Sequence, residues 1–89
     1  MKVVITIVGE DKVGIIARVS SILAEKEANI LNINQNIVDG FFNMVMIVDM
    51  TQVKGRLTDL QQLLKEEGKM LGLDIRVQHE DIFKSMHTI

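Results

Sequence analysis

The chain has 89 residues, of which 47% are apolar and 25% charged, and its net charge is −2. This length predicts a single domain over residues 1–89, with a core over 2–79 and a helical tail over 80–89. Lysine and arginine form no cluster, and Tyr and Trp are absent, which argues against nucleic acid as a partner. The lack of cysteine excludes disulfides and thiolate chemistry. No apolar run is long enough to span a membrane, so we expect a cytoplasmic protein.

The first half of the chain predicts a strand, a helix and a β-hairpin. Residues 2–8 are mostly β-branched and stop at Gly9, which is typical of a strand buried on both faces. Residues 14–26 change to helical periodicity, with one apolar stripe. Residues 30–38 alternate apolar side chains with asparagine, and Asp39-Gly40 is a strong hairpin signal. Residues 41–49 should therefore return antiparallel.

The second half predicts another helix, a short strand and a last helical turn or two. The second helix is indicated by leucines at helical spacing, namely Leu57, Leu60, Leu64 and Leu71. Gly68 and Gly72 are expected to loosen its end. Residues 75–79 fit a strand, and residues 80–86 place their apolar side chains on one side, as a short helix does.

This order of elements predicts an α+β, ferredoxin-like βαββαβ sandwich with a short C-terminal helix. Right-handed crossovers give a four-stranded antiparallel sheet in the order 4-1-3-2, with both main helices on one face. The other face should carry the asparagine row and several apolar residues: Val4, Val8, Val45 and Ile47. The second strand is an edge strand without Pro or Lys. Together these features predict a homodimer.

The turn between the first strand and the first helix is the segment most suited to binding. Two glycines, Gly9 and Gly14, flank it, and Asp11 can act as the helix N-cap. The remaining amides of the first helical turn would favour a carboxylate or phosphate. A capped helix with no ligand explains the same residues, and the spacing matches neither a P-loop nor a dinucleotide-binding fingerprint.

The same segment resembles a known family. Asp11-Lys-Val-Gly-Ile-Ile-Ala17, followed by Asn29-Ile30, is similar to the Asp-Arg-Pro-Gly-Ile-hydrophobic-Ala … Asn-Ile pattern of ACT domains. The variant resembles the ACT domains of formyltetrahydrofolate deformylase and of the glycine cleavage system repressor. His79-Glu-Asp-Ile-Phe83 and Met86-His87 resemble a small family of free-standing ACT proteins. The resemblance covers essentially the whole chain.

The resemblance implies a regulatory module that binds an amino acid where this turn meets the second strand of a neighbouring domain. By position, the ligand-binding residues would be Gly9, Asp11, Lys12, Val13, Gly14, Ile15, Asn29 and Ile30. Such a module, lacking an output domain, would act on a protein target in trans. The alternative is a structural dimerisation module with no ligand. Val13 and Glu27 depart from the pattern, and a left-handed backbone at Glu27 would cost roughly 1 kcal/mol.

Enzymatic and metal-binding alternatives have weaker support. Acylphosphatases share the predicted fold, and Arg18 with Asn32 or Asn36 loosely matches their anion-binding arginine and water-positioning asparagine. Arg18 is more simply an exposed helix residue. His79 and His87 have no third ligand at a fixed spacing, so we expect no metal, no cofactor and no catalytic residue. The chain is therefore predicted not to be an enzyme.

Overall fold

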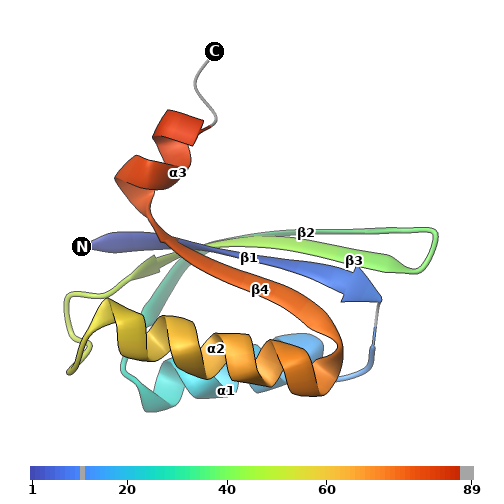
Figure 1. Ribbon diagram of the computed structural model, residues 1–89, viewed down its shortest axis with the longest axis horizontal. Coiled ribbons are helices and arrows are strands. Elements are labelled where there is room, and N and C mark those ends of the chain that lie inside the picture. Colours follow the sequence, from blue (N-terminus) through green and yellow to red (C-terminus); the bar gives the residue numbers. More distant parts are fainter. Residues whose placement is uncertain (11, 87–89) are drawn as a thin grey trace.

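The computed structural model describes residues 1–10 and 12–86. Its elements are β1 (Lys2–Glu10), α1 (Ile15–Glu25), β2 (Asn29–Val38), β3 (Phe41–Asp49), α2 (Leu57–Leu71), β4 (Leu73–His79) and α3 (Glu80–Met86). The four strands form one antiparallel sheet in the order β2-β3-β1-β4. α1 and α2 lie on one face of this sheet, and α3 lies on the other side (Figure 1). The predicted ferredoxin-like fold, strand order and terminal helix are confirmed.

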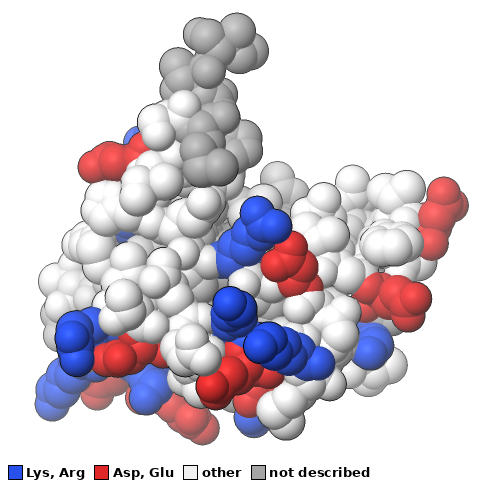
Figure 2. All heavy atoms as spheres, viewed as in Figure 1, with Lys and Arg blue, Asp and Glu red and all other residues white. Residues whose placement is uncertain are grey.

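The core lies between the sheet and the two main helices. Alternate residues of β3 point to the helices and are buried, from Phe42 to Val48, and the apolar stripes of α1 and α2 cover them. Asp39 and Gly40 both have positive φ, 51° and 79°, as a type I′ hairpin turn requires. Lys, Arg, Asp and Glu crowd the helical layer, whereas the surface over the hairpin is largely uncharged (Figure 2).

β1 differs from its prediction, because only part of it is buried on both faces. Val4 points away from α1 and α2, yet it is only 3% exposed, and α3 packs against β1 and β4. Further along the same face Val8 is exposed. The face opposite the main helices is therefore covered by α3 at one end and open at the other.

Gly68 also differs from its prediction. It is buried inside α2 and does not loosen that helix. A Cβ atom at this position would lie 2.7 Å from the carbonyl oxygen of Leu73 and 3.2 Å from Ile75 Cγ1. The absence of a side chain is what lets α2 approach β4 closely. Gly72 does end the helix, in the left-handed conformation with φ 71°.

α1 ends in a Schellman motif at Glu27. The amide of Ala28 donates to the carbonyl of Leu23 at 2.9 Å, and the amide of Glu27 donates to that of Ala24 at 3.0 Å. Glu27 sits in the left-handed region with φ 60°, as the family pattern suggested. Among the described residues, none of the three helices has the length and apolar character that crossing a bilayer requires.

Candidate functional site

α1 begins with an open N-terminus. Gly14 occupies the N-cap position with φ 88° and ψ 3°, and the first intrahelical hydrogen bond runs from the amide of Arg18 to the carbonyl of Gly14 at 2.9 Å. The amides of Ile15, Ile16 and Ala17 precede that bond and have no intrahelical acceptor. No side chain in the described part of the chain caps them, and the first turn carries no acidic residue. The predicted N-cap, Asp11, lies outside the described residues.

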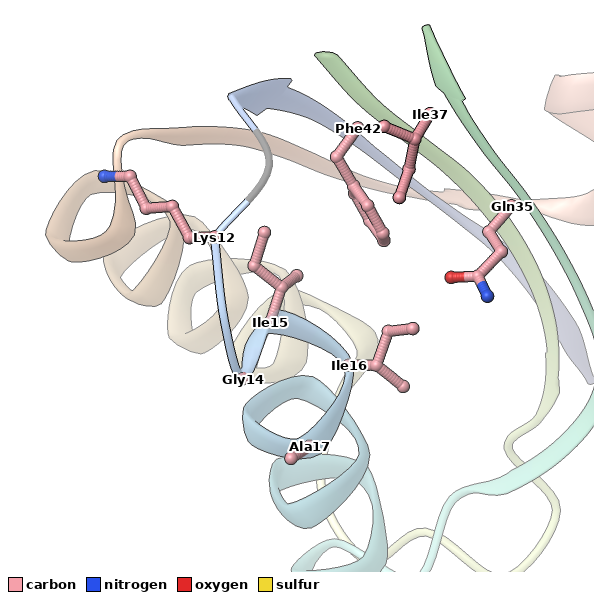
Figure 3. Close-up of a pocket in the computed structure, with 8 residues that line it drawn as sticks. All are labelled: Lys12, Gly14, Ile15, Ile16, Ala17, Gln35, Ile37 and Phe42. Carbon is pink, nitrogen blue, oxygen red and sulfur yellow. The ribbon is translucent and has the colours of Figure 1, made fainter. Parts of the chain in front are cut away.

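A pocket opens beside this helix start. Its volume is about 390 Å³, and Figure 3 shows α1 on one side of it and the β2–β3 hairpin on the other. The lining is mostly apolar and consists of Lys12, Gly14, Ile15, Ile16, Ala17, Gln35, Ile37 and Phe42. The side-chain amide of Gln35 points into the gap toward α1 (Figure 3). The pocket therefore combines helix-start amides that no described side chain caps, an apolar lining and one side-chain amide.

Lys12 has a different role from the other lining residues. Its side chain is directed away from the pocket, toward the end of α2 (Figure 3). Nζ of Lys12 donates to the carbonyl oxygen of Leu71 at 2.8 Å. That carbonyl belongs to the last turn of α2, where a cation is favoured by the helix dipole. Lys12 thus fastens the turn before α1 to the end of α2.

The structure brings only some of the predicted ligand-binding residues together. Gly14 and Ile15 lie at the pocket, and Val13 is fully exposed beside it. Gly9 lies in β1, where a Cβ atom would be 2.6 Å from Leu73 Cδ2, so its place is explained by packing.

Asn29 and Ile30 lie at the other end of the sheet from this turn. Asn29 is paired with Asp49, which is paired with Lys2, whereas the turn follows Glu10. The eight residue steps of β1 between these ends span roughly 26 Å at about 3.3 Å per step. The two halves of the predicted site do not meet within one chain.

Five lining residues were missed by sequence reasoning: Ile16, Ala17, Gln35, Ile37 and Phe42. One of them left a signal in the sequence. Gln35 pairs with the buried Met44 and shares the helix-facing side of β2 with Ile33 and Ile37. A polar residue in an otherwise apolar row indicates that the strand is not packed against the core at that point, as beside an open pocket.

Arg18 is held by α2 and not by the pocket. Nη2 of Arg18 donates to Oε1 of Glu67 at 2.6 Å, and Nε donates to Oε2 at 3.1 Å. This hydrogen bonding, together with the charge of Arg18, lowers the pKa of Glu67, and the same contacts raise the pKa of Arg18. Asn32 and Asn36 pair with residues on the opposite face of the sheet from α1. The arrangement proposed by the acylphosphatase comparison is not formed.

The tail histidine region has the contacts of a helix start. The amide of Asp81 donates to Nδ1 of His79 at 3.1 Å, and Oδ2 of Asp81 lies 3.7 Å from the same nitrogen. His87 lies outside the described residues. Over residues 1–10 and 12–86 there is no group of three or more His, Cys, Asp or Glu that could hold a metal ion.

Comparison with known proteins identifies the family. The model of the ACT domain matches residues 2–78, and the chain belongs to this family. It is 53% identical over 89 residues to a UPF0237 protein of Clostridium perfringens, covering 100% of both chains. An ACT domain protein from Streptococcus pneumoniae has a similar structure, with a TM-score of 0.81, 38% identity and 93% of each chain covered.

A formyltetrahydrofolate deformylase from Pseudomonas syringae shares the fold as well. Its TM-score is 0.80 at 22% identity, and the match covers 88% of this chain and 27% of the deformylase. At that identity the comparison establishes the fold alone. The predicted resemblance to ACT domains is confirmed by the family model, and the resemblance to the deformylase is confirmed at the level of the fold.

Proposed function

We propose that this protein is a regulatory ACT module that binds a small amino acid at the start of α1, works as a homodimer and acts on another protein in trans. The observation that carries the proposal is the pocket lined by Ile15, Ile16 and Ala17, whose amides no side chain of the described residues caps. Helix-start amides favour a carboxylate, because they are free donors at the positive end of the helix dipole.

The lining suits the rest of an amino acid. The side-chain oxygen of Gln35 can accept a hydrogen bond from an ammonium group, and no hydrogen bond of this side chain is formed within the described residues. Ile16, Ile37 and Phe42 offer apolar surface to an aliphatic side chain. A volume of about 390 Å³ is ample for a ligand of this size.

A second copy would complete the site. β2 has ten residues and lies at an edge of the sheet. If two copies of β2 pair antiparallel along their full length, the first residues of one strand lie opposite the last residues of the other. Asn29 of the second copy then faces Val38, and its Ile30 faces Ile37, which lines the pocket. This pairing unites the two halves of the predicted site, which a single chain keeps apart.

The test is titration calorimetry and thermal unfolding with glycine, serine and the branched-chain amino acids. We expect heat and thermal stabilisation with at least one of them. Ala17→Glu places a carboxylate beside the free amides and should abolish binding without unfolding the helix. Ala24→Glu, on an exposed turn of the same helix, is the matched control and should bind as wild type. Absence of heat and of stabilisation with every amino acid would end the proposal.

The dimer has its own test. Sedimentation equilibrium at micromolar protein should give the mass of a dimer. A monomer under those conditions would leave the pocket incomplete and remove the dimer from the proposal. Ligand binding by a dimer also separates regulation from the alternative of a structural dimerisation module, which would dimerise without binding any amino acid.

A further inference from the structure

The two free edges of the sheet are not equivalent. β2 and β4 are the outer strands, and each presents a row of backbone groups that another strand could pair with. A protein with two open edges can assemble in more than one way. Pairing of β2 with β2 closes after two copies, whereas pairing of β2 with β4 of the next copy continues indefinitely.

β2 has the features of an open edge. Its sequence from Asn29 to Val38 contains no charged residue. Its apolar side chains are exposed: Leu31 45%, Ile33 42%, Ile37 53% and Val38 58%. A bulge beside Leu31 interrupts the pairing with β3 at one end only, and the strand from Asn32 onward is regular. Nothing in the described part of the chain covers this edge.

β4 has the features of a shielded edge. Nε2 of Gln61, on α2, donates to the carbonyl oxygen of Val77 at 2.7 Å, so a side-chain amide already occupies the place that a neighbouring strand's amide would take. Asp74 and Arg76 form an ion pair of 3.2 Å on the same strand. Lys65 of α2 lines the hollow alongside it. Charged side chains and a bound backbone group both oppose strand addition.

We propose that Gln61 shields the β4 edge, so that copies of this chain pair only through β2 and the assembly stops at two subunits. The proposal rests on the homodimer of the proposed function and adds the residue that limits it. Without the Gln61 amide, the Val77 carbonyl would lie unpaired beside α2 and could accept from the amides of an incoming β2.

The experiment compares wild type with Gln61→Leu, which keeps the side-chain volume and removes the donor. Gln62→Leu is the matched control, because Nε2 of Gln62, one residue along α2, also donates a hydrogen bond, but to the carboxylate of Glu66 at 3.0 Å and not to the sheet. Sedimentation velocity over a range of protein concentrations should show wild type and Gln62→Leu as one species. Gln61→Leu should add species larger than a dimer, growing with concentration and visible as filaments by electron microscopy.

A second substitution identifies the surface that the larger species use. Adding Ile33→Lys to Gln61→Leu places a charge on β2 and should remove both the larger species and the dimer. If Gln61→Leu disturbs the fold by circular dichroism, Gln61→Ala removes the same donor with less bulk. A folded Gln61 variant that sediments as wild type at every concentration overturns the shield. A monomeric wild type overturns the homodimer of the proposed function instead. In that case the shielding role of Gln61 stands if the Gln61 variant forms larger species and is overturned if that variant is also a monomer.

Discussion

Replacing Glu27 with glycine should stabilise this protein. Glu27 has φ 60°, and a residue with a side chain pays about 1–2 kcal/mol for that left-handed conformation. Its side chain is exposed and makes no hydrogen bond or ion pair within residues 1–10 and 12–86, so no contact is lost. Glycine at the same place in a Schellman motif is free of the strain. Its greater conformational freedom in the unfolded chain, however, lowers the free energy of unfolding by roughly 0.4–1 kcal/mol. The net gain should be about 0.5–1 kcal/mol.

The assay is urea unfolding at one fixed protein concentration, because dimerisation makes apparent stability depend on concentration. In thermal unfolding of a domain of this size, the same gain corresponds to a rise in Tm of about 2–8 °C. Ala24→Gly is the control, since Ala24 lies in the last turn of α1, and this change should lower stability by about 0.5–1 kcal/mol. Equal or lower stability of Glu27→Gly would show that the left-handed residue is not strained.

Two further substitutions test the packing of α2. Gly68→Ala improves helix propensity, yet it should destabilise the protein by about 1–3 kcal/mol, because the new Cβ would lie 2.7 Å from the Leu73 carbonyl oxygen. A gain in stability measured by urea unfolding would contradict this close approach. Glu67→Gln should weaken the contact with Arg18 in a pH-dependent way. The pKa of Glu67 is lowered in the folded state, so its contribution is complete above the pKa of an unfolded glutamate, about 4.3, and is lost as the pH falls through the folded-state pKa. The difference in unfolding free energy between wild type and Glu67→Gln should therefore shrink below about pH 4.3, whereas a constant difference across an acid titration would refute it.

The fold could be predicted because its signals are local. The Asp39-Gly40 turn, the alternation in β2 and β3 and the change to helical spacing at residue 14 each depend on a few neighbouring residues. Together they leave one topology once right-handed crossovers are required. The left-handed conformation at Glu27 could be predicted in the same way, from its position in a short pattern.

The parts that could not be predicted depend on contacts between distant segments. In sequence, Gly68 resembles a residue that loosens a helix end. Only the close packing of β4 against α2 explains why this position has no side chain. Gln35 and Phe42 line the pocket because the β2–β3 hairpin lies opposite the start of α1. No local sequence pattern predicts this placement. Gln61 is one of two adjacent glutamines on α2, and only the position of β4 distinguishes their roles.

The two main helices begin in different ways, and the difference bears on function. At the start of α2, Oδ2 of Asp59 accepts from the amide of Arg56 at 3.3 Å, so that helix satisfies a free donor with its own side chain. α1 has no such acceptor in its first turn, although a capping side chain typically contributes about 1 kcal/mol. α1 is instead held by its buried stripe and by the Arg18 contact with Glu67. Because its stability comes from elsewhere, α1 does not need a capping acceptor in its own first turn, which is the condition that the proposed ligand site requires. Ala17→Glu should therefore raise the stability of the free protein while it removes amino-acid binding; a variant that gains stability and still binds would place the ligand away from these amides.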